Sequence, residues 1–76
     1  MQYNDFGKFI RQKRESMKPK VSLNKFAFDN DIDPAILCRV ETMQQDIKLN
    51  ILVKIAKGFN QSLSELFAEY ENNVSN

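Results

Sequence analysis

The chain has 76 residues, of which 42% are hydrophobic, and a formal net charge of +1. This length favours one small domain with a single hydrophobic core. No apolar run approaches the roughly 20 residues needed to cross a bilayer, and the N-terminus lacks the basic and apolar regions of a signal peptide. A lone cysteine, Cys38, excludes an internal disulfide. We therefore expect a cytoplasmic protein that does not associate with membranes.

Charge is distributed unevenly along the chain. Residues 1–25 contain seven basic and two acidic side chains, a net charge of +5, whereas residues 26–76 contain four basic and eight acidic ones, a net charge of −4. A basic segment of this kind suits contact with a polyanion. The simpler interpretation, which charge alone favours, is that these side chains solvate the outer face of one helix.

Apolar spacing predicts an all-α chain of five short helices without strands. The first helix has its N-cap at Asn4 or Asp5 and ends near Lys18, because the residue before Pro19 is driven out of helical geometry. Its inner face recurs at helical spacing and consists of Tyr3, Phe6, Phe9, Ile10 and Met17.

Two further helices follow, separated by a short turn. Ser22 is a suitable N-cap for the second, which carries Phe26 and Ala27 on its inner face. Asn30 and Asp31 end it, because both residue types tolerate left-handed backbone geometry.

Asp33 and Pro34 predict the start of the third helix, since Asp caps well and Pro fits the first helical position. This helix extends to Glu41 or Thr42. Wheel angles place Leu37 and Val40 inward with Ile36 beside them, and leave four residues facing outward, namely Ala35, Cys38, Arg39 and Thr42.

After a polar connection over 43–48, the fourth helix has a predicted inner face of Leu49, Leu52, Val53, Ala56 and Phe59. Asn60 ends it as a left-handed cap. Ser62 and Glu65 form a capping box for the fifth helix, whose inner face is Leu63, Leu66, Phe67 and Tyr70. We expect one domain over 1–71 and a short flexible tail over 72–76.

The ordered pattern of these segments resembles the lambda-repressor and Cro-like helix-turn-helix family of bacterial and phage regulators. The matching segments cover nearly the whole chain. They are Phe6-Gly7-Lys8-Phe9-Ile10-Arg11, Ser22 with Phe26-Ala27, Ile32-Asp33, Leu37-Cys38-Arg39-Val40-Glu41, Leu49 to Lys57, and Ser62-Leu63-Ser64-Glu65-Leu66-Phe67.

The resemblance implies a DNA-binding transcriptional regulator, most simply a repressor, that reads a symmetric operator in double-stranded DNA as a homodimer. Its third helix would lie in the major groove, while the start of the second helix and the loop after the third would contact phosphates. It also implies a structural ion pair between Arg14 and Glu41. The expected DNA-binding residues are Ser22, Asn24, Pro34, Ala35, Cys38, Arg39, Thr42, Gln44, Gln45 and Lys48.

Arg39 is the strongest candidate for base contact, because an outward arginine can bind guanine bidentately; the simpler interpretation is a solvated charge. Cys38 offers a small side chain that permits close approach to DNA. Redox sensing by this lone thiol would require a lowered pKa.

Five residues and the length of the first turn depart from the family pattern. Leu23 replaces a frequent phosphate-binding glutamine, for which Asn24 or Lys25 is a substitute. Pro34 and Ala35 stand where relatives often have polar base-reading residues. Asn30 occupies a usual core leucine position, and Met43 replaces the glycine that follows the third helix. Lys18 to Lys20 lengthen the first turn by about two residues.

Three carboxylates, Asp29, Asp31 and Asp33, surround the turn that should approach DNA. Asp33 is explained as a helix cap, but the other two would repel phosphate unless they point sideways. Their spacing also resembles a calcium loop, although the glycine and distal glutamate of that motif are absent.

An alternative function is a protein-interaction module, such as an antitoxin-like partner, that retains the fold with weak or no DNA binding. Phe28 is predicted off the inner face and either fills space left by Asn30 or marks a partner surface. Tyr70 and Val74 extend an apolar stripe suited to a dimer contact. With no histidine, paired cysteine or glycine-rich phosphate loop, the sequence predicts neither an enzyme nor a bound metal or cofactor.

Overall fold

The computed structural model describes residues 5–42 and 47–75, and five helices account for most of them. The helices are α1 (Phe6–Glu15), α2 (Leu23–Asp29), α3 (Pro34–Glu41), α4 (Leu49–Gly58) and α5 (Leu63–Ser75). Within these described ranges the chain contains no strand, which confirms the predicted all-α architecture of five short helices.

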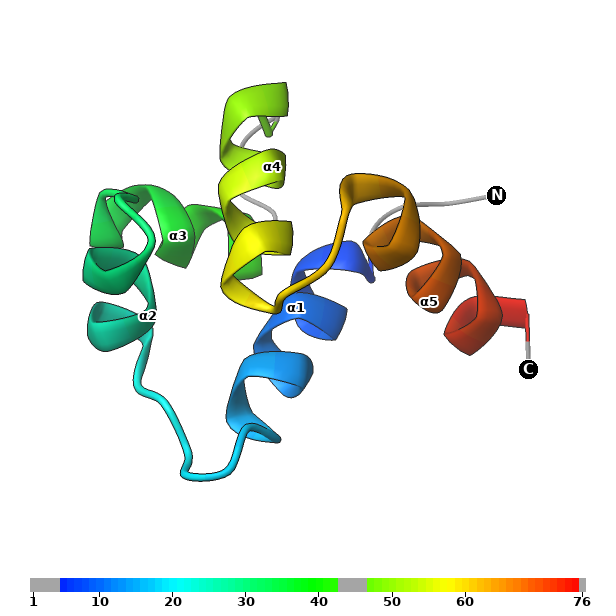
Figure 1. Ribbon diagram of the computed structural model, residues 1–76, viewed down its shortest axis with the longest axis horizontal. Coiled ribbons are helices and arrows are strands. Elements are labelled where there is room, and N and C mark those ends of the chain that lie inside the picture. Colours follow the sequence, from blue (N-terminus) through cyan, green and yellow to red (C-terminus); the bar gives the residue numbers. More distant parts are fainter. Residues whose placement is uncertain (1–4, 43–46, 76) are drawn as a thin grey trace.

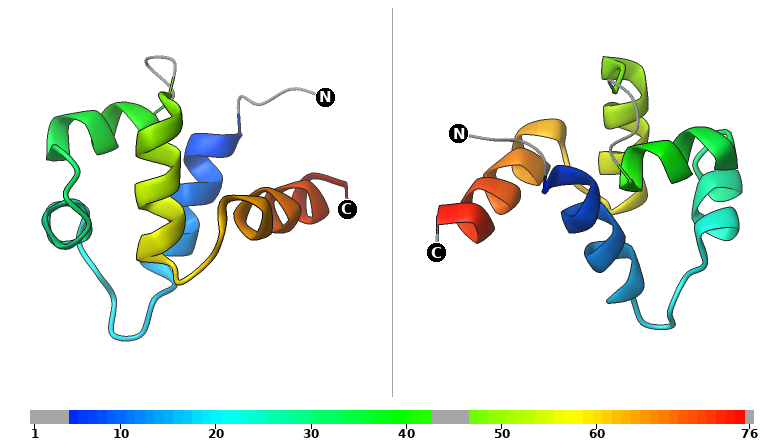
Figure 2. Two further views of the ribbon diagram at one scale, coloured as in Figure 1. Left: turned by 45° about the horizontal axis from the view of Figure 1, so that its top comes forward. Right: turned by 180° about the vertical axis from the view of Figure 1, so that it is seen from behind.

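The helices form a molecule of 31 × 27 × 18 Å with α2 and α3 at one side and α5 at the other (Figure 1). Helices α1 and α4 lie between these two sides, as the turned views also show (Figure 2). Among the described residues, no helix combines the length and apolar character that crossing a bilayer requires.

All five helices contribute to one hydrophobic core. Burial of each large apolar side chain stabilises the fold by roughly 1.5–3 kcal/mol relative to its exposure. Phe6 of α1 packs edge-on against Tyr70 of α5, with ring centroids 5.2 Å apart, and Phe9 lies 5.4 Å from the same ring. The largest fully buried side chains are Tyr70, Phe26, Ile10, Leu37, Ile55, Leu66 and Val40.

The predicted helix caps are confirmed at three helix starts. Ser22 Oγ accepts a hydrogen bond from the Lys25 backbone nitrogen at 3.2 Å, and Asp33 Oδ1 accepts one from Ala35 at 2.8 Å. At α5, Ser62 Oγ accepts from the Glu65 backbone at 3.1 Å while Glu65 Oε1 accepts from the Ser62 backbone at 2.7 Å. These bonds satisfy backbone donors that have no partner within the helix.

Two of the three residues expected to suit left-handed geometry adopt it, whereas Asn30 has φ of −116°. Asp31, between α2 and α3, and Asn60, after α4, each have φ of 58°. Asp and Asn adopt this region more readily than other non-glycine residues, so both turns form without glycine.

The predicted inner face of α4 is confirmed in part: Ala56 is buried, and Leu52 and Phe59 pack against the core. The rest of that face requires correction. The buried residues of this helix are Ile51, Ile55 and Ala56, whereas Leu49 is 65% exposed. Apolar residues occupy two faces of α4, one that begins at Leu49 and one that contains Ile51 and Ile55. The sequence pattern was assigned to the first of these faces. Packing against the other helices instead selects the face of Ile51 and Ile55, which lie one helical turn apart.

At the C-terminal end, the expected tail stays a prediction, and one expected interface residue is corrected. Helix α5 continues to Ser75, past Asn72, where a flexible tail was expected. Tyr70 is only 1% exposed, because its ring packs against Phe6 and Phe9, and it therefore belongs to the core and cannot form a dimer surface. The side chain of Val74, the other expected interface residue of α5, lies outside the described part.

Candidate nucleic-acid interface

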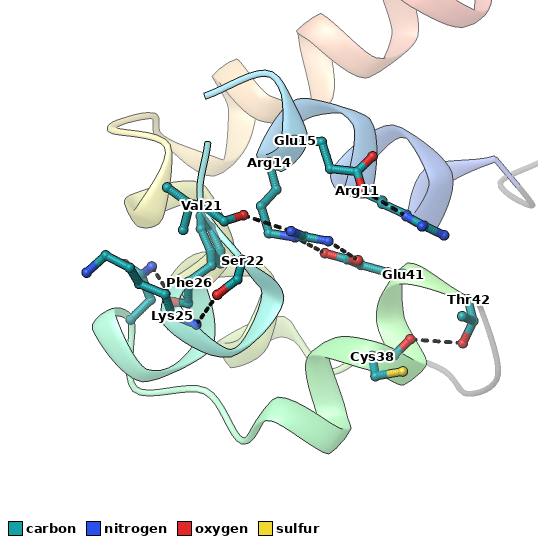
Figure 3. Close-up of polar contacts among 11 residues, drawn as sticks. Arg11, Arg14, Glu15, Val21, Ser22, Lys25, Phe26, Cys38, Glu41 and Thr42 are labelled. Atoms are coloured by element: carbon teal, nitrogen blue, oxygen red, sulfur yellow. Dashed lines mark hydrogen bonds and ion pairs between the residues drawn. The ribbon is translucent and has the colours of Figure 1, made fainter. Parts of the chain in front are cut away.

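Helix α3 is fixed to α1 by a buried ion pair. Arg14 donates from Nε to Glu41 Oε2 at 2.8 Å and from Nη2 to Glu41 Oε1 at 3.0 Å, and both residues are buried (Figure 3). Its Nη1 donates to the Val21 carbonyl at 2.8 Å. One guanidinium therefore joins α1, the segment before α2 and the end of α3, as the resemblance implied for Arg14 and Glu41.

The hydrogen bond to Glu41 raises the pKa of Arg14 above its usual value, while burial acts in the opposite direction. The arginine consequently stays charged at every pH at which the protein is folded. Disrupting this bidentate pair should lower the free energy of unfolding, because removal of one partner would leave the other charge buried without a counter-charge.

Gly7 permits the close approach of α1 to the end of α3. A Cβ atom at this position would lie 2.3 Å from the Val40 carbonyl oxygen and 2.7 Å from that of Glu41. Only glycine fits between these backbones, so Gly7 has a packing reason in this chain.

The turn between α2 and α3 is held by backbone bonds. The Ile32 nitrogen donates to the Ala27 carbonyl at 2.8 Å, and Ile32 itself is buried. Lys54 of α4 donates from Nζ to the Asp31 carbonyl at 2.9 Å. The direction of α3 relative to α2 is thus fixed by a buried side chain and by a contact from α4.

Four residues form what we call the outer face of α3: Ala35, Cys38, Arg39 and Thr42. All four are exposed, as the helical wheel predicted. Thr42 Oγ1 donates to the Cys38 carbonyl at 2.9 Å and so stays close to the helix (Figure 3). Within residues 5–42 and 47–75, no hydrogen bond or ion pair joins the Arg39 guanidinium to another side chain.

The start of α2 presents three exposed residues, Ser22, Asn24 and Lys25. Leu23 instead is half-buried and packs against the core, which explains an apolar residue at this position. Lys25 forms an exposed ion pair with Asp29, with Nζ 3.0 Å from Oδ2. Of the two residues expected to substitute for a phosphate-binding glutamine, Lys25 is thus engaged in an ion pair, and Asn24 is exposed.

Between α3 and α4 lies a hollow of about 340 Å³ with an apolar floor and a cationic rim. Lys48, the N-cap of α4, lies on its rim with Arg39. Helical patterning did not identify Asn50, a polar residue in the first turn of α4 that also lines this hollow. The floor consists of Ile36, Val40, Ile47 and Ile51. The predicted contacts Gln44 and Gln45, and the loop residue Met43, lie outside the described residues.

The three aspartates of the α2–α3 turn are engaged differently. Asp29 pairs with Lys25, Asp33 caps α3, and Asp31 has its carboxylate 3.5 Å from Lys54 Nζ. Pro34 of the predicted DNA-binding set is half-buried at the first position of α3. Within residues 5–42 and 47–75, no three histidine, cysteine or acidic side chains converge on a possible metal position, so the calcium-loop alternative gains no support.

Helix α3 is thus held against α1 on its inner side by the ion pair of Arg14 and Glu41. Its outer face is exposed and includes Arg39, and Lys48 lies at the start of α4. Ser22 and Asp33 each accept one backbone N–H in the first turn of α2 and of α3. No protein-family model, curated protein or solved structure matches this chain.

Proposed function

We propose that this chain is a sequence-specific DNA-binding regulator in which α2 and α3 act as a lambda-repressor-like helix-turn-helix and α3 reads the major groove. The outer face of α3 is the observation that carries this proposal. Its four side chains are exposed and contribute little to the core, and it holds an arginine without a partner among the described residues.

The chemistry of this face suits bases as well as phosphates. A guanidinium donates two parallel hydrogen bonds to guanine O6 and N7, and the methyl group of an alanine contacts the methyl group of thymine. Arg39 and Ala35 supply these two groups, while Cys38 is small enough to allow close approach. Ser22, Asn24 and Lys48 supply donors for the phosphate backbone, and Thr42 would join them by exchanging its bond to the Cys38 carbonyl for one to phosphate.

The rigidity of the α3 support favours the same function. To read bases, side chains must be held in a fixed position relative to the groove. A mobile helix would bind DNA more weakly, because ordering it on binding costs conformational entropy. The bidentate pair of Arg14 and Glu41, and the close contact at Gly7, hold α3 against α1 from the side opposite its outer face.

A single α3 reads only a few base pairs, so we propose that two copies bind a two-fold symmetric operator. Half-sites read this way are separated by about 34–36 Å, one turn of DNA, or by a multiple of that distance. Repression by occupancy of such an operator is the simplest regulatory outcome, because a bound dimer excludes other proteins from the site.

A salt titration with genomic and random duplex DNA tests the proposal. Phosphate contacts release counterions, so affinity should fall steeply as salt rises. Lys48→Ala should weaken binding to all sequences and reduce the salt slope by about one. Lys57→Ala, which removes an exposed lysine at the other end of α4, is the matched control and should have little effect. Absence of binding at low salt by the folded protein would contradict the proposal.

The second candidate function is a protein-interaction module on the same fold. Phe28 favours it, because this aromatic side chain is 71% exposed and lies outside the hydrophobic core. The salt titration separates the two functions, since a module that has lost DNA reading would bind neither duplex at low salt.

A further inference from the structure

The end of α2 and the turn after it form a second surface, distinct from the outer face of α3. Five residues line a hollow of about 350 Å³ there: Phe28, Asp31, Ile32, Asp33 and Pro34. We call this surface the acidic tip. We propose that the acidic tip binds a protein segment in which basic side chains flank an apolar one.

The apolar part of the argument rests on Phe28. Its exposure of 71% is the largest among the bulky hydrophobic residues of the described chain. It does not fill the space left by the polar residue Asn30, because the Asn30 side chain occupies that space itself. Asn30 Nδ2 donates to the Phe26 carbonyl at 2.8 Å and lies against Gly58. An aromatic ring with no packing role in the monomer is a natural anchor for a partner.

The charge of the rim defines the chemistry of that partner. Asp31 has a side chain that is 98% exposed, and Lys54 Nζ is closer to the Asp31 carbonyl, at 2.9 Å, than to its carboxylate, at 3.5 Å. Asp33 accepts its capping bond through Oδ1, which leaves the other oxygen open. Among residues 5–42 and 47–75, no lysine or arginine lines this hollow. The rim therefore attracts cations and repels nucleic-acid phosphate.

The acidic tip is also preorganised. Ile32 is buried, its backbone nitrogen donates to Ala27 at 2.8 Å, and Asp31 holds φ of 58°. A surface already fixed in its binding shape loses little conformational entropy when a partner docks. Binding at the acidic tip does not depend on the proposed reading of DNA by α3, and the two surfaces can be tested separately.

The test follows backbone amide resonances of the isotope-labelled full chain during titration with short synthetic peptides. One peptide has arginines flanking a leucine and a phenylalanine. In a second, glutamines replace the arginines, and in a third, serines replace the two apolar residues. We expect shift changes centred on residues 28–34 with the first peptide, and affinities lower by roughly fivefold or more with the other two.

Two exposed apolar positions provide matched variants. Phe28→Ser should lower affinity for the first peptide by roughly fivefold or more, whereas Leu49→Ser, at an equally exposed leucine of α4, should leave it unchanged. Both variants change solvent-exposed side chains, and retained dispersion of the amide spectrum verifies that each is folded.

Three outcomes of the peptide titrations would overturn the proposal. They are equal affinity for the arginine and glutamine peptides, no shift changes at residues 28–34 with the arginine peptide, and equal losses in the Phe28 and Leu49 variants. A short duplex DNA is the remaining arm. Shift changes from DNA that centre on the acidic tip would assign this surface to nucleic acid and also overturn the proposal.

Discussion

Helix α3 has two faces with different roles, and the contrast between them organises the molecule. The inner face holds Leu37 and Val40, both fully buried, and ends at the ion pair of Glu41 with Arg14. The outer face, with Arg39 at its middle, contributes little to the core. The contacts that stabilise the fold and those proposed to recognise DNA therefore lie on opposite sides of one helix. Substitutions on one side should change the free energy of unfolding, and those on the other should change DNA binding.

Arg14→Ala should produce the largest loss on the inner side. It leaves the Glu41 carboxylate buried without a partner and removes the donor to the Val21 carbonyl. We expect the free energy of unfolding to fall by about 3–5 kcal/mol, measured by urea denaturation. Arg11→Ala is the matched control, because its ion pair with Glu15 is solvent-exposed and should contribute under about 1 kcal/mol. Equal losses in the two variants would contradict the importance of the buried pair.

Gly7→Ala should have the next largest effect. The added methyl group would collide with the carbonyl oxygens of Val40 and Glu41, so α1 and α3 must move apart. Overpacking of this kind costs about 1–3 kcal/mol. Lys8→Ala, at the exposed neighbouring position, should leave the melting temperature nearly unchanged. A Gly7 variant as stable as the Lys8 variant would show that the two helices are not held by this contact.

The ion pair between α1 and α5 should have a smaller, pH-dependent effect on the free energy of unfolding. Lys13 donates to Glu69 at 2.7 Å, and this bond holds the pKa of Glu69 below its usual value of 4.5. Between the two pKa values the unfolded chain binds more protons, so the stabilisation is present above pH 4.5 and is lost as pH falls through the lowered pKa. The Glu69 side chain is 39% exposed, so we expect only about 0.2–1 kcal/mol.

Glu69→Gln should flatten this part of the stability curve between neutral and acidic pH. A residual slope will persist, because the backbone of Ser62 also lowers the pKa of Glu65. Glu71→Gln, at an exposed position on the same helix, serves as the control. If both variants show the same pH dependence as the original protein, the Lys13 contact does not stabilise the fold.

Local sequence signals predicted much of this structure because the interactions behind them are local. The caps at Ser22, Asp33 and Ser62 depend on backbone donors two or three residues away, and all three form. The outward positions of α3 followed from its wheel once Leu37 and Val40 were assigned inward.

Contacts between distant segments were harder to predict. Periodicity placed Leu49 on the inner face of α4, whereas packing against the other helices buries Ile51 and Ile55. The burial of Tyr70 depends on where α5 meets α1. The pair of Arg14 and Glu41 spans 27 positions and leaves no local signal, so only the family resemblance identified it. Asn50 was missed because its place beside Arg39 and Lys48 depends on how α3 and α4 meet.

Selection of bound sequences from a random duplex pool tests the proposed role of α3 most directly. We expect a symmetric motif with half-sites about 34–36 Å apart, or a multiple of that distance. Arg39→Ala should relax preference at one base position per half-site by about 1–3 kcal/mol. Because Arg39 is exposed, the free energy of unfolding of this variant should differ from that of the original protein by no more than about 0.5 kcal/mol. No enrichment at low salt, or a motif unchanged by Arg39→Ala, would contradict the account.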